Sequence, residues 1–297
     1  MTPVATVIIP TYDHGPTLRP ALASALAQSV ADIEVFVIGD GVPEVTREIM
    51  SAFARSDERV RFFDHPKGPR NGELYRHEAL KEAHGEIVCY LSDDDLWFPE
   101  HVETMQKLLD GHDFANSLPV HATVEAVVAS LVVDLGDPRF PNRMVGGTSF
   151  IPLSCGAHTL DAYRRLPVGW STTPPGIYTD LFMWQKFLRQ PGCRAQSGTL
   201  PTLLLFPSRG RRDSTSGERV EELERWASKV ADERWRQDFI AEVLDSTVRD
   251  RARIAADLAD AQSTRTFRLR RRVLAAPVLG SAVKALARRG VARGRER

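Results

Sequence analysis

The chain has 297 residues, of which 42% are hydrophobic and 26% are charged, and its formal net charge is zero. This composition is typical of a globular protein with one large domain, or with one domain plus appendages. Its three cysteines (Cys89, Cys155 and Cys193) show no CxxC spacing, which favours reduced thiols and a cytoplasmic setting. No apolar signal-peptide segment follows Met1, and the apolar stretch 273–283 is too short to cross a bilayer. We therefore expect neither disulfide bonds, nor secretion, nor a membrane span.

The neutral total hides a separation of charge along the chain. Residues 264–297 carry eleven Lys or Arg against one acid, Glu296, so this tail has a net charge of +10 and residues 1–263 sum to −10. Such a tail indicates an anionic partner, either a membrane surface or a nucleic acid. Apolar residues such as Phe267 and Leu269 alternate with the arginines, and they would be buried in lipid but gain nothing on a duplex. We therefore expect a basic amphipathic tail that binds an anionic membrane and no nucleic acid; a purely solubilising tail is the remaining alternative.

The first half alternates between segments of strand-like and helix-like pattern. Expected strands lie at 4–10, 33–38, 60–63 and 87–91, and expected helices at 18–27, 45–54, 73–83 and 100–109. This alternation predicts an α/β fold with a parallel sheet and helices on both of its faces.

The pattern is less regular after residue 114. The segment 124–133 resembles one long strand or two short ones, 150–153 and 203–206 are further expected strands, and 178–188 is an expected helix. Residues 218–261 contain neither Pro nor Gly and show helical apolar spacing, which predicts one long amphipathic helix or a helical hairpin.

Three adjacent carboxylates, Asp93, Asp94 and Asp95, follow the apolar strand at 87–91 after a single serine, Ser92. Ligands of open α/β sheets bind beyond the carboxyl ends of the strands, and clustered carboxylates there suit Mg²⁺ or Mn²⁺. A solvated acidic turn that caps the helix after Pro99 is an alternative, and these residues alone leave both interpretations open.

Other strand ends carry polar motifs in a defined order. They are Ile8-Ile9-Pro10-Thr11-Tyr12-Asp13-His14, then Gly39-Asp40-Gly41, then Arg76-His77 nine residues before Gly85, then Ser92-Asp93-Asp94-Asp95. Over about residues 3–212 this set resembles the family 2 glycosyltransferases of the GT-A fold. The chain departs from that pattern at Ser92, where many relatives have the first Asp of a DxD motif, at Gly39 in place of Asp, and at His77 in place of Asn.

The resemblance implies roles for these residues in binding a nucleotide-diphosphate sugar (UDP-, GDP- or dTDP-linked). Pro10, Thr11 and Asp13 would line the base and ribose. Asp40 would accept a hydrogen bond from the base, and Arg76 would face the base or diphosphate. Asp93 would hold the ribose or a metal-bound water. Asp94 would be the ligand of a Mn²⁺ or Mg²⁺ cofactor, with Asp95 as a second ligand in another register of the motif.

The acceptor side is expected in the second half of the chain. Inverting members of the family place a general base at the start of a helix, and Thr179-Asp180-Leu181 matches that pattern, so Asp180 is the candidate base. A cap formed by Thr179 or Asp180 is the structural alternative. His158, in the expected acceptor-facing loop 154–158, is either a site residue or a surface residue.

The sequence thus predicts a GT-A catalytic domain over 1–215, with a nucleotide-sugar-binding half at 1–115 and an acceptor half at 116–215. A helical extension at 216–263, which is a candidate dimerisation region, and the tail at 264–297 would follow. The resemblance implies inverting transfer of a sugar to a glycan or lipid-linked acceptor, in cell-surface polysaccharide or glycolipid synthesis. With its tail on an anionic membrane, the enzyme would be held peripherally at the inner face of the plasma membrane. Two alternatives remain: a nucleotidyltransferase of the same fold, although the Gly-rich loop of such enzymes is missing after Thr11, and a non-catalytic nucleotide-sugar-binding scaffold.

Overall fold

A computed structural model describes residues 2–123, 127–129 and 132–263. The chain divides into two compact units, Met1–Ala241 and Glu242–Arg297. The basic tail predicted at 264–297 lies outside the described residues, so its membrane binding stays a prediction.

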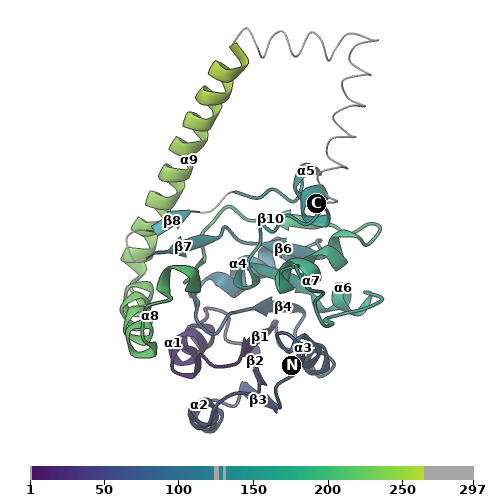
Figure 1. Cartoon of the computed structure of the whole chain (residues 1–297), viewed down its shortest axis with the longest axis vertical. Coiled ribbons are helices and arrows are strands. Elements are labelled where there is room, and N and C mark those ends of the chain that lie inside the picture. The colour runs from purple at the N-terminus through teal and green to yellow at the C-terminus, as the bar shows by residue number, and fades with distance from the viewer. Residues whose placement is uncertain (1, 124–126, 130–131, 264–297) are drawn as a thin grey trace. The chain divides into compact units, whose positions relative to one another are not determined.

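The first unit is built on a seven-stranded sheet with the strand order β10-β6-β9-β4-β1-β2-β3 (Figure 1). The strands are β1 Ala5–Thr11, β2 Ile33–Asp40, β3 Val60–His65, β4 Ile87–Tyr90, β6 Phe114–Asn116, β9 Gly156–Thr159 and β10 Ala195–Ser197. All pairs are parallel except those of β9, which runs antiparallel to β4 and β6. The predicted mostly parallel sheet is confirmed, and β1, β2 and β4 end at one edge because they are parallel neighbours.

The expected strand at 150–153 is wrong. Leu153–Cys155 form a 3-10 helix, η1, and the sheet strand in this region is β9, four residues long. The sequence of β9, Gly-Ala-His-Thr, has only one β-branched residue, so propensity gives little indication of it. Tertiary packing selects it instead: a Cβ at Gly156 would lie 2.5 Å from the Trp184 ring.

Two short pairs supplement the main sheet. β5 Leu96–Trp97 pairs antiparallel with β11 Leu203–Leu204, and β7 Val120–Ala122 pairs antiparallel with β8 Val127–Ala129. The pairing of β5 with β11 connects the segment just after the three aspartates to a segment about a hundred residues later in the chain.

Helices flank the sheet (Figure 1). They are α1 Gly15–Leu26, α2 Glu44–Ser56, α3 Glu73–Leu80, α4 His101–Leu109, α5 Arg139–Val145, α6 Leu160–Arg164 and α7 Thr179–Leu188, with a second 3-10 helix, η2, at Ser208–Arg211. In Figure 1, α1 and α2 lie on one side of the sheet and α3, α6 and α7 on the other. The apolar positions of α1 face the core, and the helix begins at Gly15, three residues before its first core leucine, Leu18.

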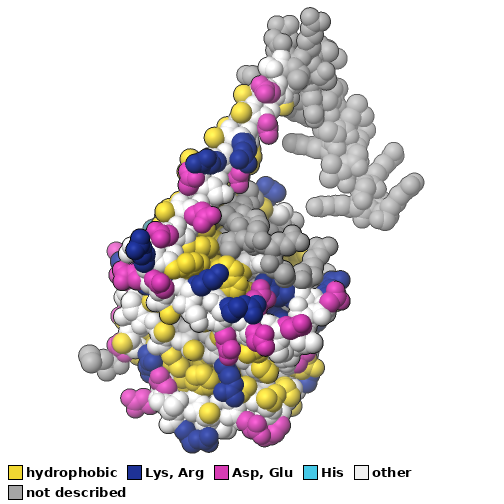
Figure 2. Space-filling model, turned by 90° about the vertical axis from the view of Figure 1, so that its left-hand side faces the viewer, with side chains coloured by type: hydrophobic (Ala, Val, Ile, Leu, Met, Phe, Trp, Pro, Cys, Tyr) yellow, Lys and Arg dark blue, Asp and Glu magenta, His cyan; other side chains and the backbone are white. Residues whose placement is uncertain are grey.

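The helical region after residue 215 consists of two helices, α8 Ser216–Ala231 and α9 Glu233–Ser263, which are separated at Asp232. α8 begins with a capping box, in which Thr215 Oγ1 accepts from the Glu218 amide and the Glu218 carboxylate accepts from the Thr215 amide. α8 then packs against α1. Figure 2 shows this side of the molecule, where acidic and basic side chains alternate with apolar ones. Among the described helices, none combines the length and apolar character that a bilayer crossing needs.

Candidate functional site

A pocket of about 550 Å³ lies where β1, β2 and β4 end. The predicted site residues that line it are Pro10, Thr11, Asp13, Asp40, Arg76, Asp93, Asp94 and Asp180. Residues from the first and second halves of the chain therefore meet in one pocket, as a donor site next to an acceptor site requires.

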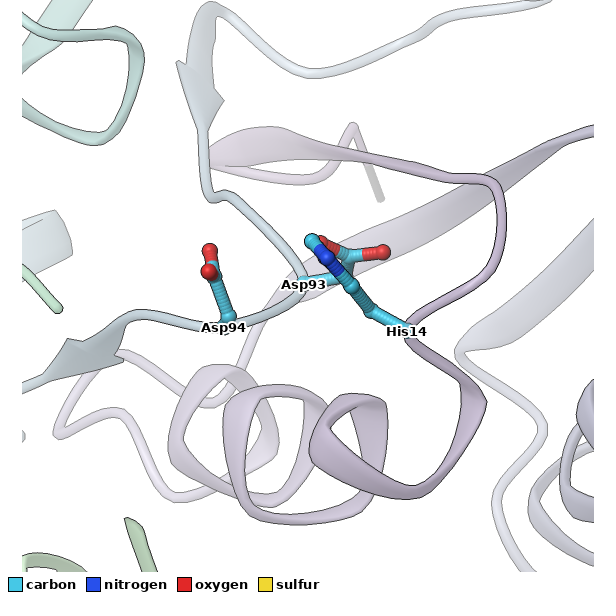
Figure 3. A group of neighbouring side chains, drawn as sticks. All are labelled: His14, Asp93 and Asp94. Atoms are coloured by element: carbon cyan, nitrogen blue, oxygen red, sulfur yellow. The ribbon is translucent and has the colours of Figure 1, made fainter. Parts of the chain in front are cut away.

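An acidic cluster with one histidine forms part of the pocket wall (Figure 3). Asp93 and Asp94 come from the loop after β4, and His14 directly precedes α1. One ligand atom from each of the three residues lies within 4.8 Å of the others, and His14 Nδ1 is 3.1 Å from Asp93 Oδ1. Imidazole and carboxylate groups at this spacing fit a divalent cation such as Mn²⁺ or Mg²⁺, the cofactor that the sequence predicts.

The charges of this cluster influence one another. The hydrogen bond to Asp93 raises the pKa of His14, while burial acts in the opposite direction. Burial raises the pKa of Asp94, the neighbouring Asp93 carboxylate adds to this effect, and His14 and Arg219 oppose it. Two partly buried carboxylates side by side therefore favour a nearby positive charge.

That positive charge comes from α8. Arg219 Nη2 donates to Asp94 Oδ2 at 2.6 Å, and Arg219 Nη1 lies 3.3 Å from His14 Nε2. The two side chains of the ion pair are only 12% and 13% exposed. The helical extension thus places a positive charge against Asp94, although Arg219 itself is not among the residues that line the pocket.

Asp95 is not brought into the pocket. Its Oδ2 accepts from Ser154 Oγ at 2.5 Å, and its Oδ1 accepts from the Phe206 amide at 2.9 Å. Ser154 Oγ also accepts from the Ser92 amide, so this carboxyl group braces the loop after β4 against two later segments. We therefore correct the expectation that Asp95 is a metal ligand, because its buried carboxylate is not part of the pocket lining and does not belong to the cluster of His14, Asp93 and Asp94.

Asp40, at the end of β2, lies 6% exposed at the pocket. Its Oδ1 accepts from the Gly68 amide and its Oδ2 from Lys67 Nζ, both at 2.6 Å. The backbone at Gly72 packs directly against the Asp40 carboxyl group. Only glycine fits there, because the residue has φ +62° and a Cβ would lie 2.6 Å from the Asp40 carboxyl carbon. Each carboxylate oxygen has a second lone pair, so Asp40 retains acceptor capacity towards the pocket.

Two polar side chains of the pocket are buried without complete hydrogen bonding. Arg76 is 5% exposed, its Nη2 donates to the Asn71 carbonyl at 2.9 Å, and its guanidinium stacks over the Trp170 ring. Arg76 Nε, Arg76 Nη1 and Thr11 Oγ1 have no hydrogen-bond partner among the described residues. Buried donors without partners are rare in proteins, and in a pocket wall they indicate a polar ligand that completes them.

Asp180 lies in the first turn of α7, where it faces the pocket. Its Oδ1 accepts from the Leu181 amide at 2.7 Å, and burial raises the pKa of its carboxyl group. The cap residue of α7 is Tyr178, whose side chain makes no capping hydrogen bond, while Thr179 Oγ1 accepts from Asn71 Nδ2 at 2.7 Å. Asp180 thus accepts a first-turn amide of α7 and also lines the pocket, so its position fits a structural role at the helix start as well as a catalytic one.

His158 is not a site residue. It lies in β9 with no exposed surface, its Nε2 is 2.8 Å from the Tyr90 hydroxyl, and burial lowers its pKa to about 4. It is a core histidine whose ring is held by a tyrosine. His77, where relatives carry Asn, forms a hydrogen bond with Tyr163 instead of lining the pocket.

Sequence reasoning missed the pocket residues His14 and Lys67, and it missed Arg219, which forms an ion pair with the pocket residue Asp94. His14 follows a recognisable strand end, so its position alone was a usable signal. Arg219 offered no signal, because it is one of several charged residues on an amphipathic helix more than 120 positions from Asp94.

A family model described as Glycosyl transferase family 2 matches residues 6–167, which is more than half of the chain. The chain therefore belongs to glycosyl transferase family 2.

Individual relatives match a shorter region. The chain is 32% identical over 122 residues to the GalNAc(5)-diNAcBac-PP-undecaprenol beta-1,3-glucosyltransferase of Campylobacter jejuni, over 39% of this chain and 38% of that protein. It is 36% identical over 99 residues to the succinoglycan biosynthesis protein ExoW of Rhizobium meliloti, over 33% of this chain and 31% of that protein. The match thus spans about a third of the length of these relatives.

Among solved structures, the chain is similar to S. aureus TarS in complex with UDP-GlcNAc. The TM-score is 0.56 at 18% identity, and the similarity covers 81% of this chain and 71% of that one. At this identity the similarity concerns the fold, and it confirms the predicted GT-A architecture.

Proposed function

We propose that this protein transfers a sugar from a nucleotide-diphosphate donor to an acceptor hydroxyl, with inversion at the anomeric carbon and with the help of a divalent cation. One observation carries the proposal: the cluster of His14, Asp93 and Asp94 and the carboxylate of Asp180 line the same pocket at the ends of the parallel strands. The family and the fold agree with this reaction class.

The donor would occupy the part of the pocket formed by the first half of the chain. Thr11 and Arg76 offer buried donors without partners, and Asp40 offers acceptor capacity for a base edge. His14, Asp93 and Asp94 would hold the cation, which would neutralise charge on the departing diphosphate. TarS, which shares the fold and was solved with UDP-GlcNAc, supports a nucleotide sugar as donor.

The acceptor would lie on the α7 side of the pocket. Asp180 would accept the proton of the acceptor hydroxyl as that oxygen attacks the anomeric carbon. The raised pKa of Asp180 makes its carboxylate a stronger base than an exposed aspartate. Attack from the face opposite the leaving diphosphate gives inversion in a single displacement.

A lipid-linked glycan fits the acceptor role best. The Campylobacter relative is named for an acceptor on an undecaprenyl carrier, and the Rhizobium relative is named for polysaccharide synthesis. The basic amphipathic tail at 264–297 would hold the enzyme at an anionic membrane where such acceptors lie. Co-sedimentation with anionic vesicles of the full chain against a 1–263 truncation tests the tail separately; equal pelleting of both excludes it as an anchor.

The reaction is tested with a panel of UDP-, GDP- and dTDP-linked sugars. In the presence of Mn²⁺, hydrolysis of each donor and thermal stabilisation of the protein by each donor are measured. A true donor at 100 times its dissociation constant stabilises the protein by about 2.7 kcal/mol. Release of pyrophosphate from a nucleoside triphosphate and a sugar phosphate would instead establish the nucleotidyltransferase alternative. Donor binding without any turnover on acceptors would establish the scaffold.

A further inference from the structure

Arg219 contacts two residues that the proposed cation also needs, His14 and Asp94. Its Nη2 is 2.6 Å from Asp94 Oδ2, and its Nη1 is 3.3 Å from His14 Nε2. Both residues belong to the cluster in which one ligand atom from each of His14, Asp93 and Asp94 lies within 4.8 Å of the others. The Asp13 carboxylate, 3.8 Å from His14 Nε2, adds negative charge on the same side.

The hydrogen bonds of His14 define which ring nitrogen faces Arg219. For Nε2 to accept from the guanidinium it must carry the lone pair, so the proton resides on Nδ1, 3.1 Å from Asp93 Oδ1. A carboxylate that orients a histidine in this way leaves the other nitrogen as a ligand, an arrangement common around metal ions in proteins. The guanidinium therefore lies where the His14 lone pair and the Asp94 carboxylate converge.

Arg219 is held in this position by the fold. It lies in the first turn of α8, just after the capping box of Thr215 and Glu218, and α8 packs on α1, which His14 precedes. The side chain is 12% exposed, and its Nε is buried without a hydrogen-bond partner among the described residues. A guanidinium in such surroundings requires an anionic partner, because an unpaired buried charge is strongly unfavourable.

We propose that Arg219 is a tethered cation that competes with the divalent cation for His14 and Asp94, and that it moves to the donor diphosphate when the divalent cation binds. The proposal rests on the proposed function. With the divalent cation on Asp94, Arg219 loses its anionic partner, and the diphosphate is the anion that arrives in the same pocket. The unpartnered Nε and the two Nη groups give the guanidinium a fork of donors that suits a phosphate group.

This exchange couples the two ligands thermodynamically. The divalent cation alone must break the Arg219–Asp94 pair, so it binds weakly, whereas cation and diphosphate together leave every charge with a partner. Each ligand therefore increases the affinity for the other, and coupling of this kind usually amounts to roughly 5- to 150-fold in affinity. The device keeps the acidic cluster neutralised between turnovers and favours the cation together with the diphosphate over the cation alone.

The test measures binding and not activity. Binding of Mn²⁺ in the absence of nucleotide is followed by the electron paramagnetic resonance signal of the free ion, and binding of UDP and GDP by calorimetry with and without Mn²⁺. Arg219→Gln should bind Mn²⁺ alone about 10-fold more tightly than the wild type and, with Mn²⁺ present, bind the nucleoside diphosphate about 10-fold more weakly. Arg219→Lys, which keeps the charge but cannot bridge both atoms, should fall between them and serves if the glutamine variant does not fold. Arg225→Gln, an exposed arginine of the same helix, should behave as the wild type.

The outcomes separate this inference from the proposed function. Equal Mn²⁺ affinity in the wild type and both Arg219 variants overturns the competition but leaves the donor site intact. Nucleotide binding that needs no divalent cation in the wild type, and that Arg219→Gln abolishes, overturns the exchange and assigns the cation's role to Arg219 itself. A wild type that binds neither Mn²⁺ nor any nucleoside diphosphate overturns the proposed function together with the inference.

Discussion

The carboxylates on the two sides of the pocket differ in whether they form an ion pair. On the proposed donor side, Asp94 forms an ion pair with Arg219, and Asp93 forms a hydrogen bond with His14. On the proposed acceptor side, Asp180 accepts a hydrogen bond from the Leu181 amide, and no ion pair to it is present in the described part of the chain. Both sides are partly buried, and burial raises the pKa of Asp94 and of Asp180.

The difference follows from the chemistry that each side would perform. A group that holds a cation has to stay ionised, and nearby positive charge favours its ionised form. A general base has to take up a proton during the reaction, and a permanent ion pair would lower its basicity. An ion-paired carboxylate and an unpaired one in one pocket thus agree with the proposed binding role of Asp94 and the proposed proton-transfer role of Asp180.

The largest expected effect is that of Asp94→Asn. The amide keeps the shape of the side chain but removes the charge that the cation needs, so transfer should fall by more than roughly 10³-fold and Mn²⁺-dependent nucleotide binding should be lost. Calorimetry with UDP and GDP, with and without Mn²⁺, measures the binding. Asp110→Asn, at the end of α4 outside the pocket, is the control. Full activity of Asp94→Asn, or of the wild type in EDTA, would show that the reaction needs no divalent cation.

Asp180→Asn should separate chemistry from binding. We expect turnover to fall by roughly 10²- to 10⁴-fold, the usual contribution of a general base, while donor affinity changes little. Steady-state kinetics with calorimetry of donor binding distinguishes the two quantities, and NMR of the product should show inversion at the anomeric carbon. An active variant would exclude Asp180 from proton transfer and abolish the contrast between the two sides.

Arg76→Gln tests whether Arg76 contributes to nucleotide binding on the proposed donor side. A hydrogen bond to a charged group contributes about 1.5–3 kcal/mol, so loss of the free guanidinium donors should weaken nucleoside diphosphate binding by roughly 10- to 100-fold. Urea unfolding should show little loss of stability, because Arg76 has few hydrogen-bond partners of its own. Unchanged nucleotide affinity would show that Arg76 is structural and that its stacking on Trp170 is its main role.

The smallest expected effect is on the pH dependence of stability, and it tests whether His158 of β9 is buried in the core. His158 is fully buried and its pKa is lowered to about 4, so the unfolded chain binds this proton more readily than the folded protein between pH 6.5 and 4. Stability should therefore fall as the pH falls through this window, and His158 should account for about 2 kcal/mol between pH 7 and pH 5. Urea unfolding of His158→Gln at both pH values should show a fall that is smaller by this amount. His84→Gln, at an exposed position, is the control, and an unchanged pH dependence in His158→Gln would contradict the burial.

Much of the donor side was readable from the sequence. Buried parallel strands are continuous apolar runs, so the places where Pro10, Asp40 and Asp93 interrupt them mark the strand ends, and parallel pairing brings those ends together. Asp180 was proposed from the resemblance to inverting family 2 glycosyltransferases, whose general base stands at the start of a helix, and the structure places it in the pocket. The sequence could not show that Asp95, adjacent to Asp94, would be buried outside the pocket lining, since its position depends on hydrogen bonds to the distant residues Ser154 and Phe206.

The tertiary structure alone decided which distant groups complete the site. β9 has too little β propensity to be predicted; it is defined by its pairing with β4 and β6, and the close contact with Trp184 requires glycine at position 156. Arg219 looks like any solvated arginine on α8, and only the packing of that helix on α1 brings its charge to Asp94. Local sequence thus determined the elements and their polar ends, because periodicity and turn chemistry act over a few residues. The pairing of charges across more than a hundred residues depends on packing geometry, which no local pattern encodes.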